Sequence, residues 1–257
     1  MFLNHIRFAI RNLKNQRMHT LVILLGLSVS MASAFLIYSY VYFERSYDDF
    51  HQDKNNLYRV VVDAQEVGKN TYKSPYSFSG QGPTALDEVP EVKSFTRLIP
   101  LSSMVISRAG ESDDFEIFTI DDYYYADENF FKTFSFPLIQ GNAENVLTKS
   151  GSMVITETLA QKLFGKENPI GKILLIDGKY TNKVTGVMED IPENTHLKFD
   201  IIFPMKNIPQ LLQTKNEWSN HSFFTYLILK DGADPNIAEA KITQAYLKEN
   251  RAVDQSN

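Results

Sequence analysis

The sequence contains no cysteine among its 257 residues. A chain without cysteine forms no disulfide and offers no thiolate ligand to zinc. This lack fits an exported domain but does not prove one.

Acidic residues outnumber basic residues after the first 43 positions. Residues 1–19 carry Arg7, Arg11, Lys14 and Arg17 without one acidic residue, and the formal charge of the whole chain is −5. Removing those four cations leaves −9 for residues 44–257. A nucleic-acid backbone needs a basic surface, so this acidic part is not expected to bind DNA or RNA.

The common catalytic motifs are also missing. There is no G-x-S-x-G, Walker A or S-x-x-K sequence. The five histidines form neither an i, i+4 pair nor H-E-x-x-H, and they are His5, His19, His51, His196 and His221. We therefore expect no enzyme activity, no catalytic or metal-ligating residue and no bound cofactor.

One motif superficially resembles a nucleotide site. Gly80 to Ala85 reads GQGPTA and matches the dinucleotide fingerprint G-x-G-x-x-A. The preceding residues 71–79 do not read as a buried strand, however, and Pro83 removes a backbone donor that a phosphate cradle would use. The sequence favours a loop that leads into a short helix.

Two pairs of adjacent acids raise the possibility of calcium binding or acid–base catalysis. They are Asp113 with Asp114, and Asp121 with Asp122. Neighbouring residues on a strand point to opposite faces, so neither pair converges on a ligand. Solvent exposure at a sheet edge is the favoured interpretation.

A long apolar run is present near the N-terminus. Leu21 to Phe43 gives 23 residues without a charge, and a helix of that length covers roughly 34 Å, enough to cross a bilayer. The small residues Ala32 to Ala34 match the cleavage site of a signal peptide, which stays an alternative, but the apolar run continues beyond them. The tyrosines at 38, 40 and 42 suit a headgroup region. We expect a retained transmembrane helix at residues 20–43.

The basic leader, residues 1–19, predicts the orientation of that helix. Positive charge resists translocation, so the N-terminus should be cytoplasmic and residues 44–257 should lie outside. Phe2, Ile6, Ile10 and Leu13 recur at helical spacing between the cations. This pattern predicts an amphipathic helix that lies on lipid at the inner membrane surface, with a frayed polar leader as the alternative.

The part after the span mixes strands and helices, which predicts an α+β domain without repeats. Strands are expected at 58–64, 94–100, 102–108, 116–126, 153–156, 199–204 and 223–230, with a hairpin of 172–176 and 180–188 turned at Asp177 and Gly178. Helices are expected at 80–89, 127–134, 157–164 and from Asp234 through Tyr246, with Gly165 closing the third.

Four phenylalanines cluster at positions 130, 131, 134 and 136. Their spacing places at least two rings on one face, which favours burial in a core. A substrate-binding aromatic patch is the alternative.

Several motifs follow one another in a recognisable order. They are YDDFH at 47–51, NLYRV at 56–60, DENFFKTFSFPLIQG at 127–141, VITETLAQKLFG at 154–165, NPIGK at 168–172 and VTGVMEDIPENTHLKFD at 184–200. Together they resemble the periplasmic core domain of MacB-like, FtsX-type ABC transporter permeases. The resemblance extends from the basic leader to about Leu229.

The resemblance implies a bacterial inner-membrane permease that works as a dimer with a separate ATPase subunit and sometimes a periplasmic adaptor. Such permeases convert ATP hydrolysis into periplasmic movement that exports antimicrobial peptides, macrolides or lipoproteins. Family members have four membrane helices, whereas this sequence shows one and ends soon after the last predicted strand. The chain alone is therefore not expected to transport.

Two other functions stay open from the sequence. A single span with an exported α+β domain is also how a ligand sensor is built, although 19 residues before the span leave no room for a signalling module. An anchored binding or assembly module without transport is the second alternative, and its partners would distinguish it from a permease.

Overall fold

The computed structural model describes residues 2–64, 71–108, 117–208 and 221–254. The chain forms two compact units, Met1–Asp49 and Phe50–Asn257.

The first unit consists of two helices. Helix α1 covers Phe2–Asn15 and helix α2 covers Arg17–Arg45. They are separated at Gln16, whose backbone (φ −112°, ψ 55°) is not helical. Within the described residues α2 is the one helix long and apolar enough to cross a membrane, with a mean hydropathy of 2.3 over 18 residues. The predicted helices before and within the apolar run are confirmed, and Ala32–Ala34 lie inside α2.

The second unit contains twelve strands among its described residues. In chain order they are β1 Leu57–Arg59, β2 Val62–Ala64, β3 Tyr72–Ser74, β4 Ser77–Phe78, β5 Val92–Arg108, β6 Ile117–Ala126, β7 Leu138–Gln140, β8 Ser152–Thr156, β9 Ile173–Ile176, β10 Tyr180–Met188, β11 Ile201–Pro204 and β12 His221–Leu229. Ten of these strands form one mixed sheet in the order β1-β12-β5-β6-β11-β8-β10-β7, with β4 beside β12 and β9 beside β10 and β5. Strands β2 and β3 make a separate hairpin.

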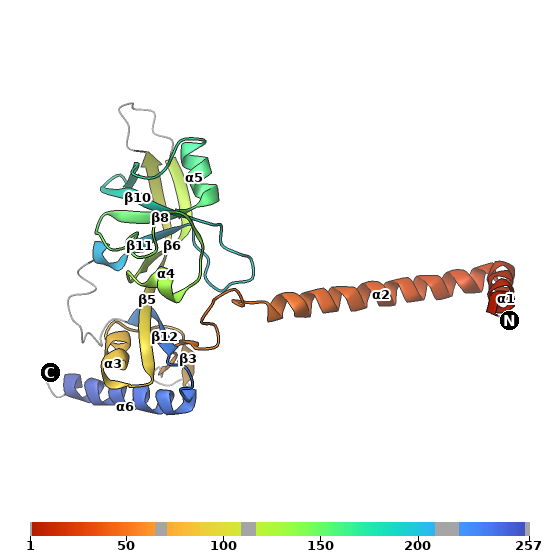
Figure 1. Cartoon of the computed structure of the whole chain (residues 1–257), viewed down its shortest axis with the longest axis horizontal. Helices are drawn as coiled ribbons and strands as arrows, with labels where there is room; N and C mark the ends of the chain where they lie inside the picture. Colours follow the sequence, from red (N-terminus) through yellow and green to blue (C-terminus); the bar gives the residue numbers. More distant parts are fainter. Residues whose placement is uncertain (1, 65–70, 109–116, 209–220, 255–257) are drawn as a thin grey trace. The chain divides into compact units, whose positions relative to one another are not determined.

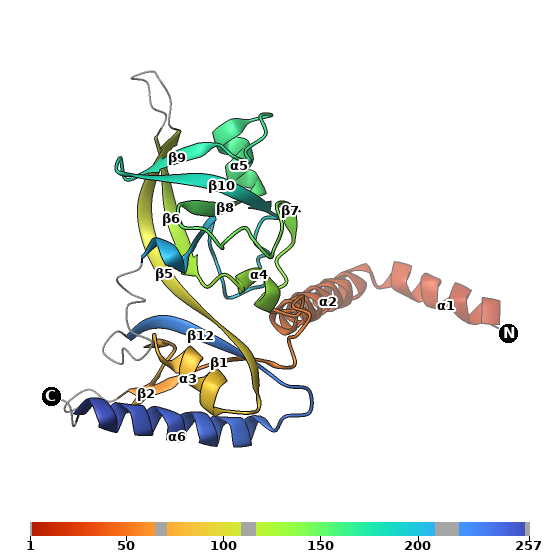
Figure 2. The same cartoon turned by 60° about the vertical axis from the view of Figure 1, so that its left-hand side comes forward.

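The helices of this unit are α3 Gln81–Glu88, α4 Phe130–Thr133, α5 Glu157–Phe164, the 3₁₀ turn η1 Met205–Asn207 and α6 Pro235–Asp254. Figures 1 and 2 show α3 and α6 at one end of β5, and α5 with β9 and β10 at the other. We call β1–β4, α3, β12 and α6 the first lobe. We call β6–β11, α4 and α5 the second lobe. The prediction of an α+β domain is confirmed.

Strand β5 runs through both lobes. It pairs with β12 from Val92 to Leu98, with β6 from Leu98 to Ser107 and with β9 from Ile106 to Arg108. Among the described strands, only β6 pairs with the stretch between Leu98 and Ile106. Pro100 lies in this stretch. Proline has no backbone N–H, and the edge of β5 that faces away from β6 needs none there because no described strand pairs with it.

The prediction of two strands at 94–100 and 102–108 is therefore wrong, because they are one strand. Pro100 and the polar pair at 102–103 interrupt the sequence pattern, and Ser103 has a positive φ of 62°. The backbone nevertheless continues the antiparallel pairing with β6 on both sides of them.

The second lobe is built around two apolar layers. One lies between α5 and the sheet and includes Met153, Ile155, Leu163 and Phe164. The other lies on the opposite face and contains Val154 together with the phenylalanines at 130, 131, 134 and 136. All five residues of β8 are buried because both of its faces are covered. The predicted core role of the four phenylalanines is confirmed, since all are buried.

The local signals at the second-lobe turns are also confirmed. Asp177 and Gly178 have positive φ angles of 50° and 66° and join β9 to β10. Gly165, with φ 60°, ends α5. In the first lobe the Asp234 carboxylate accepts the backbone N–H of Asn236 at the start of α6, as expected of a capping residue.

Two sequence interpretations of the first lobe need correction. The expected strand at 58–64 is two short strands, β1 and β2, which belong to different sheets. Residues 71–79, which did not read as a buried strand, contain β3 and β4. Ser77 is buried there because its hydroxyl lies 2.6 Å from that of Thr225 and donates to the Phe223 carbonyl at 2.9 Å.

Candidate functional site

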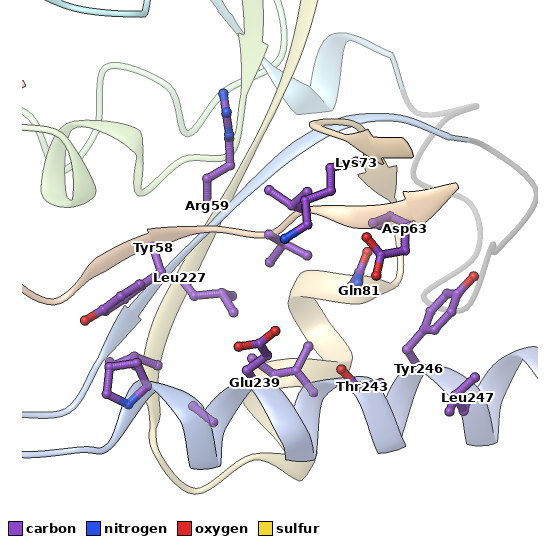
Figure 3. Close-up of a pocket in the computed structure, with 17 residues that line it drawn as sticks. Tyr58, Arg59, Asp63, Lys73, Gln81, Leu227, Glu239, Thr243, Tyr246 and Leu247 are labelled. Atoms are coloured by element: carbon purple, nitrogen blue, oxygen red, sulfur yellow. The ribbon is translucent and has the colours of Figure 1, made fainter. Parts of the chain in front are cut away.

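The first lobe contains a groove between the edge of the sheet and α6. Its walls come from β1, β2, β3, the start of α3, β12 and α6, and it has a volume of about 550 Å³. In Figure 3, Lys73 and Asp63 extend from the β2–β3 hairpin, and Glu239 rises from α6 into the same space. We call this cavity the α6 groove.

The α6 groove has an apolar floor with charges of both signs above it. Val60, Leu227, Leu229, Ala238 and Ile242 line the floor. The charges come from exposed side chains, of which Arg59 and Lys73 are basic and Asp63 and Glu239 are acidic. This combination suits a peptide or another amphipathic segment, because the floor buries apolar groups while the rim pairs polar ones.

Ion pairs hold α6 in place along this groove. Lys241 bonds to Glu91, which immediately precedes β5, and the Lys248 ammonium donates to the Glu88 carboxylate of α3 at 2.8 Å. The hydrogen bond from Lys241 lowers the pKa of Glu91. Helix α6, which forms one wall of the groove, is thereby bonded to Glu91 beside the first residue of β5, and β5 continues into the second lobe.

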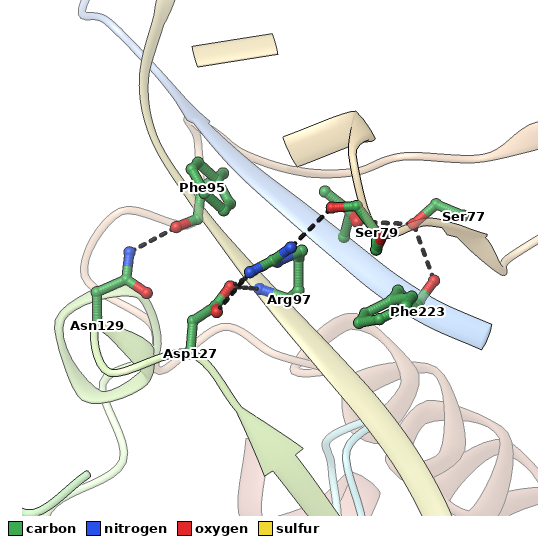
Figure 4. A network of polar contacts seen from close by, with 8 residues as sticks. Ser77, Ser79, Phe95, Arg97, Asp127, Asn129 and Phe223 are labelled. Atoms are coloured by element: carbon green, nitrogen blue, oxygen red, sulfur yellow. Dashed lines mark hydrogen bonds and ion pairs between the residues drawn. The ribbon is translucent and has the colours of Figure 1, made fainter. Parts of the chain in front are cut away.

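A polar network joins β5 to both lobes (Figure 4). The Arg97 guanidinium donates to both oxygens of Asp127, each at 3.0 Å, and to the Ser79 carbonyl at 2.7 Å. Asn129, just before α4, donates its amide to the Phe95 carbonyl. Arg97 thus connects the segment before α3, the strand β5 and the end of β6.

The residues considered as catalytic or metal sites are dispersed. Asp121 and Asp122 are exposed, as expected, but β6 is an inner strand between β5 and β11 and not an edge of the sheet. Asp113 and Asp114 lie outside the described residues. GQGPTA forms the N-terminus of α3, as the loop-to-helix interpretation predicted. Across the described part of the chain, no group of three histidine, aspartate or glutamate residues is placed to hold a metal ion.

Two of the histidines, His51 and His196, pack against aromatic side chains. His51 is buried against Phe50, Phe134 and Phe136, and its Nδ1 accepts the Ser135 backbone N–H at 3.2 Å. His196 lies 2.6 Å from the Tyr226 hydroxyl through its Nε2 atom. His196 therefore packs against β12 of the first lobe, and His51 packs against the aromatic cluster of the second lobe.

The α6 groove and the Arg97 network were not found from the sequence. One signal was available for the network: Arg97 is a single cation inside the apolar run SFTRLIP. A charge at such a position needs a buried partner. No comparable signal marks the groove, because its walls come from segments far apart in the chain.

Comparison with solved structures supports the fold. A domain of a putative permease protein from Porphyromonas gingivalis aligns with a TM-score of 0.66 at 21% identity, covering 77% of this chain and 83% of that one. The periplasmic region of MacB from Actinobacillus actinomycetemcomitans aligns with a TM-score of 0.52 at 18% identity, covering 74% and 81%. The extracellular domain of the noncanonic ABC-type transporter YknZ from Gram-positive bacteria aligns with a TM-score of 0.51 at 15% identity, covering 76% and 93%.

A search of curated protein sequences found no match. A family model, in contrast, covers nearly the whole chain. Residues 20–245 match the MacB-like periplasmic core domain. The chain therefore belongs to the MacB-like periplasmic core domain family of ABC transporter permeases.

Proposed function

We propose that this chain is the membrane-anchored periplasmic part of an ABC transporter permease, which couples ATP hydrolysis by a separate subunit to substrate export. Family membership combined with the apolar helix α2 carries this proposal. The chain itself has no catalytic role in it, since the ATPase subunit supplies the energy.

The charge pattern supports an inward N-terminus. Arg7, Arg11, Lys14 and Arg17 precede the apolar part of α2, and Glu44 is the first acid. Such an asymmetry keeps the basic end of the helix on the cytoplasmic side of the bacterial inner membrane. Residues 1–19 then form the cytoplasmic leader, residues 20–43 the span and residues 44–257 the periplasmic domain.

The continuous strand β5 supports a mechanical role. It hydrogen bonds with β12 of the first lobe and with β6 and β9 of the second, so its own backbone transmits displacement between the lobes. A separate ABC ATPase, a second copy of the permease and a periplasmic adaptor are the partners that this role requires. Antimicrobial peptides, macrolides and lipoproteins are the proposed substrate classes.

Cysteine labelling tests the orientation, because the natural chain contains no cysteine. We would place a single cysteine at the exposed Asn15 of α1 or at the exposed Gln244 of α6. A membrane-impermeant maleimide should label Gln244→Cys in intact spheroplasts and Asn15→Cys only after permeabilisation. The reverse pattern would overturn the proposed orientation.

Reconstitution tests the coupling. The chain in proteoliposomes with a candidate ABC ATPase should show no substrate-stimulated ATP hydrolysis until permease helices of the family are supplied. Stimulation by this chain and the ATPase alone would contradict the proposed division of labour.

The α6 groove favours a second candidate, an anchored binding or assembly module without transport. Its apolar floor and mixed charges are features of a peptide-binding surface. Copurification distinguishes the two functions: a permease part should retain an ATPase subunit in mild detergent, whereas a binding module should retain a periplasmic partner and no ATPase.

A further inference from the structure

The bend between α1 and α2 is closed by polar contacts. The Thr20 hydroxyl donates to the Leu13 carbonyl at 3.0 Å, and the Thr20 backbone N–H donates to the Gln16 carbonyl at 2.9 Å. The Arg17 Nε donates to the Lys14 carbonyl at 3.4 Å. These contacts cross the single non-helical residue and give the bend a defined geometry.

A second groove lies in this bend, with a volume of about 490 Å³. Lys14 and Arg17 line its polar end, and Leu13, Leu21, Leu24 and Leu25 line its apolar part. Residues 21, 24 and 25 follow helical spacing, so they form one stripe along α2 that leads away from the two cations. We call this cavity the elbow groove.

The charges around the elbow groove indicate which kind of molecule it binds. Residues 1–43 contain four cations and no acid, so a second copy of these helices would bring like charges to the same place. A zwitterionic lipid also carries a phosphate, but its own cation would lie close to Lys14 and Arg17. A phospholipid with a net negative headgroup satisfies both ends, because its phosphate pairs with the cations and an acyl chain covers the leucines.

We propose that the elbow groove is a binding site for one anionic phospholipid, with the headgroup phosphate between Lys14 and Arg17 and an acyl chain along Leu21, Leu24 and Leu25. The proposal rests on the proposed membrane span of α2. It goes beyond general attraction of the leader to lipid, since it distinguishes two of the four cations from the others.

Paired charge variants test the headgroup end. The full chain would be placed in nanodiscs of phosphatidylcholine with a trace of phosphatidylglycerol, and the phosphatidylglycerol bound per chain would be measured by native mass spectrometry. Lys14→Gln with Arg17→Gln should lower its apparent affinity about 25-fold, since each cation near an anionic surface contributes about fivefold. The matched control, Arg7→Gln with Arg11→Gln, removes the same charge and should change it less than twofold.

Paired leucine variants test the acyl end. Leu24→Ala with Leu25→Ala should reduce retained phosphatidylglycerol, whereas Ile23→Ala with Leu27→Ala, which alters the same helix away from the groove, should not. Millimolar inorganic phosphate should fail to displace the lipid, because the headgroup contacts alone do not account for binding.

Two outcomes would overturn the site. One is equal loss of phosphatidylglycerol in both charge pairs, which would show nonspecific surface attraction. The other is equal retention of phosphatidylcholine and phosphatidylglycerol by the natural chain. Release of the natural chain from membranes by alkaline carbonate would instead overturn the proposed span, which separates failure of the anchor from failure of the lipid site.

Discussion

Arg97 and Asp127 meet through three hydrogen bonds. The Arg97 backbone N–H and Nε donate to Asp127 Oδ2 at 2.9 and 3.0 Å, and Nη2 donates to Oδ1 at 3.0 Å. The side chains are only 12% and 16% exposed. Because the same guanidinium also reaches the Ser79 carbonyl, loss of either partner affects both lobes at once.

Asp127→Ala should lower the free energy of unfolding of the periplasmic domain by about 3–5 kcal/mol, since it leaves the Arg97 charge buried without its partner. Glu167→Ala removes the partner of Arg108 in an exposed ion pair and should cost at most about 1 kcal/mol. Urea unfolding followed by circular dichroism measures both. Equal losses in the two variants would contradict a special role for the buried pair.

Phe130→Ala should cost about 3–5 kcal/mol, because the ring is fully buried among Phe131, Phe134 and Phe136 and the residues around it cannot close the cavity. Ile117→Ala, at a side chain that is 66% exposed, is the control and should change stability by less than about 0.5 kcal/mol. If Phe130→Ala unfolds at the natural urea midpoint, the aromatic cluster is not part of the core and the substrate-patch alternative returns.

Gly141→Ala should destabilise the domain more than Gly232→Ala. Both glycines have positive φ angles, 104° and 76°, so alanine is strained at each. A Cβ at Gly141 would in addition lie 2.9 Å from the Thr185 carbonyl oxygen and 3.1 Å from the Gly186 Cα, whereas nothing lies within 4 Å at Gly232. We expect about 1 kcal/mol for Gly232→Ala and at least about 2 kcal/mol for Gly141→Ala, measured by thermal unfolding. Similar losses would show that the backbone at Gly141 has room to move.

Alkaline pH should destabilise the second lobe through Tyr125. Burial raises the pKa of Tyr125 to about 12, with Tyr123, Asp177 and Tyr180 adding electrostatic repulsion. In the unfolded chain tyrosine ionises near pH 10, so its contribution to stability is complete below pH 10 and is lost as the pH rises from 10 to 12.

Tyr125→Phe should therefore make stability fall less steeply between pH 10 and 12, while Tyr58→Phe at an exposed site should not. Urea unfolding at several pH values measures the slopes. Ionisation of Tyr125 near pH 10, detected by the difference in tyrosinate absorbance between the natural chain and Tyr125→Phe, would contradict its burial.

Local signals predicted the elements that local chemistry determines. The hairpin at Asp177 and Gly178 and the end of α5 at Gly165 need backbone angles that few residues adopt. The start of α6 at Asp234 needs a capping oxygen. Each of these signals lies within a few residues of the element that it defines, so the sequence was sufficient.

Elements that depend on distant partners were not predicted. Val60 and Val61 separate β1 from β2 because the chain leaves β12 there and pairs with β3 instead, which the alternating residues do not reveal. β7, Leu138–Gln140, was also missed, since its three residues pair with β10 nearly fifty positions later. For the same reason the α6 groove, assembled from four strands and two helices, left no continuous pattern in the sequence.

The uneven pairing of β5 determines where this domain is easiest to bend. Val92–Arg97 pair with β12 on one edge and Ile99–Val105 pair with β6 on the other, so among the described strands only Leu98 and Ile106–Ser107 have a neighbour on each edge. The pairing with β12 and the pairing with β6 overlap at Leu98 alone, so a change of angle between the two lobes is concentrated there. Such a change would move α5 and the β9–β10 hairpin, at the far end of β5 (Figures 1 and 2), through the longest arc, and would leave the strand pairing inside each lobe intact.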